Sequence, residues 1–356
     1  MVAEVLAAYP PPPAWVLTGP GDDAAVVEFG ADDPQAPSGV VRVVASTDTL
    51  VEGSDFRWDL SSPREVGIKL AAQTLADIAA MGARPMALLV SLAAPGELPS
   101  ALPVELARGL AEECARAGAT MIGGDVSASA QVVLTGTALG VLDGGRAAVV
   151  RSGARSGDLV ALAGRPGCSA AGLDLLLAGV AAGDAAGEPS GREVPERGPE
   201  PALEQLMAVH RAPRPSYAAG PRARAAGATA LIDTSDGLLR DAARVASASG
   251  VVIDLDPARL PRDRRLPVAA RRLLGPDQMP DQEPGQVADQ VLEWVLTGGE
   301  DHALLACFPQ DAVVPEEFTV VGRVLPGDHG EPRGPAGAAV LVGGRPWPGR
   351  AGWTHW

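Results

Sequence analysis

The chain has 356 residues, 46% of them hydrophobic, and a formal net charge of -15 at pH 7. This length and composition predict a globular protein of two domains with real hydrophobic cores. The negative charge argues against nucleic acids or anionic membranes as partners, because both would be repelled without a basic patch. A polyanionic substrate would need metal ions to screen the repulsion.

The cysteines and the apolar runs bear on cellular location. Cys114, Cys168 and Cys307 are far apart and odd in number, so they predict neither a disulfide framework nor a CxxC metal site. The apolar runs are too short to span a membrane, and the first residues lack the pattern of a secretory signal. We therefore expect a cytoplasmic protein.

Strand and helix patterns alternate along the chain in two blocks. The first block predicts strands over residues 24–29, 40–46, 86–94, 119–123 and 131–142, and helices over residues 64–81 and 104–117. After the glycine-rich stretch "GGRAAVVRSGARSGD", the second block predicts strands over residues 159–164, 228–233, 251–256, 303–308 and 318–324. Its helices are expected over residues 170–182, over residues 237–248 and before Leu296.

These blocks predict two α/β or α+β domains, residues 1–148 and residues 149–356, that meet at a cleft. Residues 184–202 are polar and rich in Pro and Gly, which is typical of a disordered insertion.

Acidic residues recur beside small residues near the ends of these elements. The stretches are "GPGDDAAVV", "STDTLVEG", "TLADIAAMGA", "MIGGDVSAS", "LIDTSDGLLRD" and "VLTGGEDHALL". Each alone is explained by a turn or a helix cap, with Ser235 or Asp236 as the expected N-cap of the helix that follows, but six in one chain form a pattern. Hard oxygen ligands without a His/Cys cluster favour magnesium over zinc.

The helix over residues 64–81 is apolar nearly all round, which is typical of a buried helix. Its polar exceptions, Lys69, Gln73 and Asp77, recur every four residues and therefore lie on one stripe. Lys69 is also the only lysine of the chain. The stripe predicts a polar site inside the protein, with a buried structural ion pair as the alternative.

Taken together, the motifs resemble those of the thiamine-monophosphate kinases, members of the aminoimidazole-ribonucleotide synthetase superfamily of ATP-using enzymes. The stretches that carry the resemblance are "GDDAAV", "STDTLVEG", "LADIAAMGARP", "IGGD", "RSGARSGD", "GCSAAGL", "HRAPRPSY", "IDTSDGLLRD", "GGEDHALL" and "GWTHW". The resemblance implies phosphorylation of thiamine monophosphate to thiamine diphosphate by direct, Mg²⁺-assisted transfer from ATP. It also implies a homodimer built through the N-terminal sheet, and a C-terminal α/β domain.

The resemblance assigns roles to matching residues. It implies metal ligands at Asp23, Ser46, Thr47, Asp48, Asp77, Asp125, Asp233 and Asp236, of which Asp23, Asp48, Asp77, Asp125 and Asp233 are also the expected catalytic residues. Gly124, Arg151 and Ser235 would lie near the nucleotide, and Asp55, Glu300 and Trp353 near the thiamine end. The chain departs from the family pattern at Asp55 for a frequent His, Ala76 for a usual Ser and His302 for a usual Tyr.

Other functions stay open at this point. The chain has no GxxxxGK[ST] loop and no protein-kinase motifs, so a nucleotide would be held by metals, backbone amides and arginines. Another ATP-using member of the superfamily, such as an aminoimidazole-ribonucleotide synthetase, is the nearest enzymatic alternative. A non-catalytic binder of nucleotides or thiamine phosphate, and a magnesium-dependent phosphohydrolase, would use similar residues.

Overall fold

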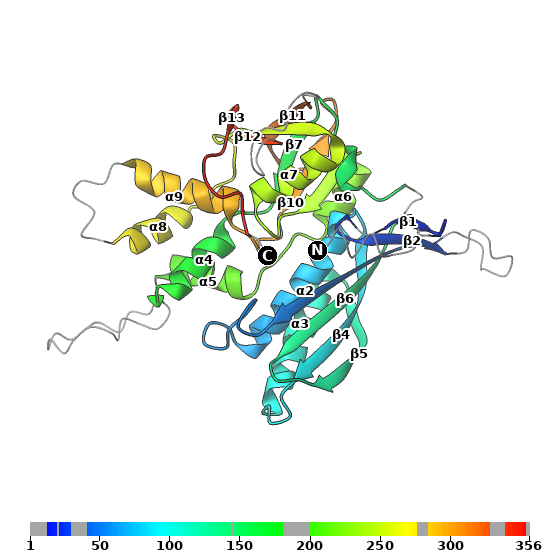
Figure 1. The fold of residues 1–356 in the computed structure, drawn as a ribbon, viewed down its shortest axis with the longest axis vertical. Helices are drawn as coiled ribbons and strands as arrows, with labels where there is room; N and C mark the ends of the chain where they lie inside the picture. Colours follow the sequence, from blue (N-terminus) through cyan, green and yellow to red (C-terminus); the bar gives the residue numbers. More distant parts are fainter. Residues whose placement is uncertain are drawn as a thin grey trace.

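The computed structural model describes residues 13–19, 21–29, 41–143, 146–180, 200–275, 284–327 and 339–353. These residues form two β-sheets with helices packed against them, which confirms the expected mixed α and β class (Figure 1). The predicted insertion over residues 184–202 lies outside the described residues as far as residue 199, and residues 201 and 202 begin a helix.

The first sheet has six strands in the order β1-β2-β3-β6-β4-β5, and only β4 and β5 pair in parallel. The strands are β1 (Val16–Thr18), β2 (Ala25–Phe29), β3 (Val41–Val51), β4 (Arg84–Ala94), β5 (Thr120–Ala128) and β6 (Val133–Val141). Helices α2 (Pro63–Ala80) and α3 (Ala101–Ala117) connect the strands and pack together (Figure 1). The other face of the sheet carries exposed side chains.

Helix α2 lies at the centre of this layer, as its apolar pattern predicted. It begins at a capping box in which the Ser62 side chain accepts from the Glu65 N–H and the Glu65 carboxylate accepts from the Ser62 N–H. Gly67 lets α3 approach closely, because a Cβ there would lie 2.2 Å from the Leu106 carbonyl oxygen. The helix is therefore buried along most of its length.

Two strands extend further than the sequence predicted, so Asp48 and Asp125 lie inside strands rather than at strand ends. Strand β3 pairs with β6 continuously from Val43 to Val51, and threonine pairs on the open face support this register. Strand β5 continues past Gly124, where a Cβ would lie 1.9 Å from the Val90 carbonyl oxygen. Glycine thus permits the close pairing with β4.

The second sheet has seven strands in the order β13-β12-β9-β11-β7-β10-β8. They are β7 (Leu159–Ala163), β8 (Ala230–Asp233), β9 (Val251–Leu255), β10 (Leu304–Phe308), β11 (Thr319–Pro326), β12 (Val340–Val342) and β13 (Arg345–Pro346). Strand β10 is buried throughout and pairs with both β7 and β8, which agrees with its continuous apolar sequence. The site described below lies at the end of β8.

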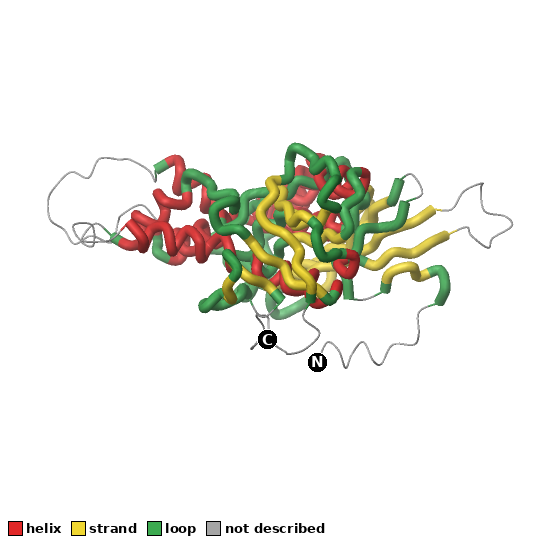
Figure 2. Tube along the Cα trace, turned by 90° about the horizontal axis from the view of Figure 1, so that it is seen from above, coloured by secondary structure: helices red, strands yellow, loops and turns green. Residues whose placement is uncertain are grey.

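The helices of the second half are α4 (Cys168–Leu177), α5 (Pro201–Arg211), α6 (Ala219–Ala225), α7 (Leu238–Ser249), α8 (Leu266–Leu274) and α9 (Pro284–Thr297), after a 3-10 turn η1 (Arg151–Gly153). Figure 2 shows a group of helices at one end of the molecule, which Figure 1 identifies as α4, α5, α8 and α9. Local patterns did not predict helices α5, α6 and α8 or strands β1, β12 and β13.

Helix α7 starts differently from the sequence expectation. Its N-cap is Gly237, not Ser235 or Asp236. The side chain that satisfies the helix start is that of Asp241, which accepts the backbone N–H of Asp236 at 3.0 Å and of Gly237 at 3.1 Å. Burial raises the pKa of Asp241 to about 7. Asp241 is therefore explained by local structure.

None of the helices in the described ranges is long and apolar enough to cross a membrane. Cys114, Cys168 and Cys307 are all buried and unpaired with one another.

Candidate active site

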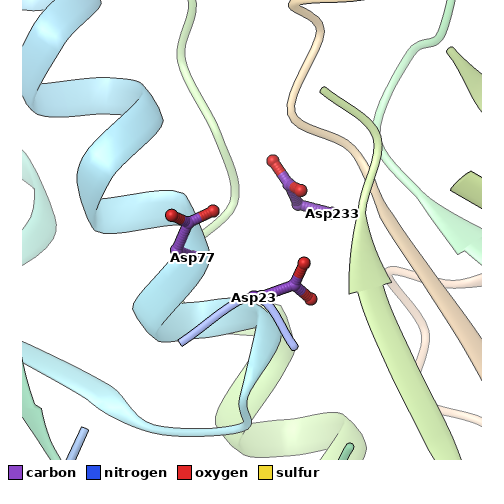
Figure 3. A group of neighbouring side chains, drawn as sticks. All are labelled: Asp23, Asp77 and Asp233. Atoms are coloured by element: carbon purple, nitrogen blue, oxygen red, sulfur yellow. The ribbon is translucent and has the colours of Figure 1, made fainter. Parts of the chain in front are cut away.

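Three aspartates from distant parts of the sequence converge between the two sheets. Asp77 comes from α2, Asp23 from the turn before β2, and Asp233 from the end of β8. Each offers a carboxylate oxygen within 4.8 Å of the others, and their carboxylates face a common space (Figure 3). We call Asp23, Asp77 and Asp233 the acid cluster.

The acid cluster carries more negative charge than its protein neighbours neutralise. Asp23 is 2% exposed; Oδ1 accepts from Arg151 Nη2, whereas Oδ2 has no hydrogen-bond partner within the described residues. Burial, and then the charge of Asp233, raise the pKa of Asp23 well above its usual value despite Arg151. Burial and the charges of Asp48, Asp233 and Asp23 likewise raise the pKa of Asp77. A buried cluster of this kind requires protons or a cation.

The neighbouring Asp22 has a different role from Asp23. Its carboxylate accepts the backbone N–H of Asp23 and that of Arg151, each at 3.0 Å. These bonds fasten the turn before β2 to η1 and direct Asp23 toward the other acids. Of the two adjacent aspartates, Asp22 thus holds the turn in place and Asp23 belongs to the acid cluster.

Strand β3 contributes its residues to two different faces. Ser46 Oγ donates to Asp77 Oδ2 at 2.6 Å and lies 3.2 Å from the carbonyl oxygen of Asp23, so it joins two members of the acid cluster. Asp48 lines a cavity that Asp77 and Asp233 also line. Thr47 points to the open face, where its hydroxyl donates to the Gly136 carbonyl at 2.9 Å. Ser46 and Asp48, but not the Thr47 side chain, therefore lie with the acid cluster.

Asp125 and Gly124 lie far from the acid cluster within one chain. The register places Asp48, Gly136, Val90 and Gly124 side by side across β3, β6, β4 and β5. Three strand spacings separate Gly124 from Asp48 by roughly 14 Å. The exposed Asp125 side chain points to the open face, where Ser127 Oγ donates to its Oδ2 at 3.0 Å.

The end of β8 and the loop after it hold Asp233, Ser235 and Asp236 beside a cavity. Asp233 Oδ2 lies 2.9 Å from His302 Nδ1, and this bond raises the pKa of His302 although burial alone would lower it. Asp236 accepts from Arg244 and lies 3.5 Å from Arg240 Nε. His302 therefore pairs with a carboxylate of the acid cluster.

A cavity of about 990 Å³ extends from the acid cluster and is lined by Asp55, Glu300 and Trp353. The Trp353 side chain is 61% exposed, and its backbone N–H donates to the Asp236 carbonyl at 2.9 Å. Asp55 Oδ2 accepts the Val51 N–H at 2.8 Å, so this carboxylate closes the turn after β3. The acids and an exposed aromatic ring thus share one cavity.

Glu300 is fixed by two side chains whose roles the sequence did not reveal. Lys69 Nζ donates to Glu300 Oε1 at 2.9 Å, and His210 Nδ1 lies 3.2 Å from Glu300 Oε2. Burial opposes ionisation of Glu300, but Lys69 and His210 together lower its pKa well below the usual value. His210 belongs to the "HRAPRPSY" motif, which was the only available signal for it.

The first half of the chain matches a known protein family. Residues 21–142 match the family described as AIR synthase related protein, N-terminal domain. This range contains α2, most of the first sheet, and the cluster members Asp23 and Asp77. Residues 21–142 therefore form an N-terminal domain of the AIR synthase-related class.

Relatives that match over most of this chain identify its family more closely. The thiamine-monophosphate kinase of Mycobacterium tuberculosis (strain ATCC 25618 / H37Rv) is 44% identical over 341 residues, which are 96% of this chain and 86% of that protein. That of Corynebacterium glutamicum is 37% identical over 309 residues, covering 87% and 82% of the two chains. The chain belongs to the thiamine-monophosphate kinase family, as its motifs indicated.

A solved structure extends the likeness to the whole fold. The structure described as "AaThiL complexed with AMPPCP and TMP" matches with a TM-score of 0.74 at 26% sequence identity. The match covers 100% of this chain and 94% of that one. The expected two-domain fold class is thereby confirmed.

Proposed function

We propose that this protein transfers the γ-phosphoryl group of ATP to the phosphate of thiamine monophosphate, forming ADP and thiamine diphosphate. Family membership supports the reaction, and a relative described as complexed with AMPPCP and TMP supports the substrates. The observation that carries the proposal is the acid cluster beside a cavity of about 990 Å³ that also contains Glu300 and Trp353.

The residues of the acid cluster fit magnesium. Their donors are hard carboxylate oxygens, and the buried, unpartnered Asp23 Oδ2 supplies one that the described protein leaves available. We propose that Asp23, Asp77 and Asp233 hold Mg²⁺, with Ser46, Asp48 and Asp236 as further ligands or supports. Bound Mg²⁺ would neutralise charge between two phosphate-bearing substrates. Thr47 and Asp125 stay predicted ligands, although their side chains lie on the other face of the sheet within one chain.

The remaining residues position the substrates, which is most of what phosphoryl transfer requires from a protein. Arg151, beside Asp23, and Ser235, on the cavity wall, are proposed to lie near the nucleotide. Glu300 is proposed to attract the cationic thiazolium electrostatically. The exposed indole of Trp353 suits the same cation, because an aromatic face attracts positive charge.

We also propose that the protein is a homodimer formed through the open face of the first sheet. Met86, Leu89 and Ile122 are large apolar residues of β4 and β5 that the single chain leaves exposed. A second copy on this sheet would give Asp125 and Thr47 new neighbours. The domain boundary between residues 148 and 149 and a cytoplasmic location belong to the same proposal.

The reaction is tested with purified protein, ATP, Mg²⁺ and thiamine monophosphate. Thiamine diphosphate and ADP should appear in equal amounts and only when Mg²⁺ is present. Phosphate release without thiamine monophosphate would indicate a hydrolase instead. Binding of both substrates without turnover would indicate a non-catalytic binding protein.

A further inference from the structure

Lys69 is the only lysine of the chain, and its side chain is only 3% exposed. It lies on α2 two helical turns before Asp77, about 12 Å along the axis at 1.5 Å per residue. The ammonium group is thus well separated from the acid cluster. Its hydrogen bond with Glu300 joins α2 to a turn 231 residues away in sequence.

The Glu300 side chain is held on both oxygens. Lys69 from α2 contacts Oε1 and His210 from α5 contacts Oε2, while the Glu300 N–H donates to the Ser235 carbonyl at 2.9 Å. Even so, 36% of the side chain remains exposed and Glu300 lines the cavity. Its carboxylate therefore has a fixed direction, and part of the side chain is exposed to the cavity.

The backbone at this point is unusual. Glu300 has a φ of 62°, a left-handed conformation that a residue with a Cβ adopts at some cost. Such a conformation persists when surrounding contacts hold it. The contact with Lys69 is one of those that hold Glu300 in place.

We propose that Lys69 is a positioning residue that keeps Glu300 ionised and directed at the thiamine end of the substrate. The inference rests on the proposed function, since it assigns Glu300 to that end. Lys69 acts through Glu300 rather than on the substrate, because its ammonium is buried and already bonded to the carboxylate. The proposal extends the site to α2, from which Lys69 lines the same cavity as Glu300.

The test is a double-mutant cycle of Lys69→Met, Glu300→Gln and the double variant, followed by steady-state kinetics and thermal unfolding. Lys69→Met should raise KM for thiamine monophosphate about tenfold or more, equivalent to about 1.4 kcal/mol. KM for ATP should change less than about twofold. In the Glu300→Gln background, Lys69→Met should have little further effect, because coupled residues are not additive.

Arg64→Met is the matched control. Arg64 is another cation of α2, but it pairs with Glu112 at 2.7 Å on the surface. Its loss should leave both KM values unchanged. Lys69→Arg keeps the positive charge but moves the hydrogen-bond donors, so it should raise KM for thiamine monophosphate and leave KM for ATP unchanged. This variant replaces Lys69→Met in the test if Lys69→Met does not fold.

Several results would overturn the role of Lys69. Additive effects in the cycle would indicate that Lys69 acts directly on the substrate or elsewhere. An equal rise of both KM values with a lowered Tm would indicate a structural role. A folded Lys69→Arg with unchanged KM would exclude positioning. A wild-type protein that makes no thiamine diphosphate would refute the proposed function itself, before any variant is compared.

Discussion

Replacing Asp23 with Asn should separate catalysis from folding, because the native carboxylate is unfavourable in the metal-free protein. Asp23 is 2% exposed, and its pKa is raised by burial and by the charge of Asp233. The amide keeps the shape of the carboxylate and can still accept from Arg151. It cannot provide the negatively charged oxygen that Mg²⁺ prefers.

The magnitudes favour a stable variant. At 4.8 Å and an effective dielectric constant of about 20, the repulsion from Asp233 is about 3.5 kcal/mol. The attraction of Arg151 is about 4 kcal/mol for charge centres roughly 4 Å apart, so these two interactions nearly cancel. Burial, the largest cause of the raised Asp23 pKa, then decides the balance, so Asp23→Asn should be as stable as the wild type without Mg²⁺, or more stable.

Turnover, unlike stability, should fall when Asp23 is replaced by Asn. Loss of a residue that merely supports a metal ligand costs about 10- to 100-fold, so loss of a ligand should lower kcat at least about 100-fold. The wild-type Tm should rise with Mg²⁺, because a ligand that binds only the native state stabilises it. The Tm of Asp23→Asn should respond much less.

Asp22→Asn is the matched control, measured by the same calorimetry and kinetics. Its carboxylate accepts two backbone N–H groups, and an amide oxygen reproduces this poorly, so stability should fall by about 1 kcal/mol. Its Tm should keep the response to Mg²⁺. A metal-free Asp23→Asn that unfolds well below the wild type, but retains turnover and the Mg²⁺ response, would refute the reasoning.

Three further predictions concern the cavity, a histidine and the open sheet face. Trp353→Ala should raise KM for thiamine monophosphate about 2- to 30-fold without lowering Tm, because the indole is 61% exposed and a cation–π contact is worth about 0.5 to 2 kcal/mol; an unchanged KM would remove Trp353 from the substrate site. Burial, and then the charge of Lys69, lower the pKa of His210. The unfolded chain therefore binds a proton at His210 that the native protein rejects, so the contribution of His210 to the free energy of unfolding should fall below about pH 6.5, by up to 1.4 kcal/mol per pH unit. In thermal melts at several pH values, the wild type should lose stability relative to His210→Asn as the pH falls, and a difference that does not change with pH would contradict this assignment. Sedimentation should show a dimer for the wild type and a folded monomer for Leu89→Asp. A monomeric wild type would contradict the proposed interface.

Local sequence patterns predicted the main elements and part of the site. The all-round apolar pattern of α2 indicated that Lys69 and Asp77 lie inside the protein, and both are found there. Asp233 was expected at a strand end and lies at the end of β8. These features depend on residues near one another in sequence, which is why periodicity and turn chemistry reveal them.

The remaining features depend on pairing between distant segments. Asp125 and Asp48 belong to similar motifs, yet the strand order places β6 and β4 between their strands. The bulge in the pairing of β4 with β5 also changes which β5 residues share a face with those of β4. The partner of Lys69 could not be inferred either, because no local pattern relates α2 to the turn that contains Glu300.

That turn has a consequence for any attempt to make the protein more robust. Glu300 and His302 are the non-glycine residues with left-handed φ in the described chain, at 62° and 48°. Strain of this kind amounts to about 1 to 3 kcal/mol per residue. Glycine at either position would relax the backbone but remove the partner of the buried Lys69 or Asp233, which costs about 3 to 5 kcal/mol. The ion pairs therefore maintain the strained turn, and substitutions chosen for thermal resistance should leave both residues in place.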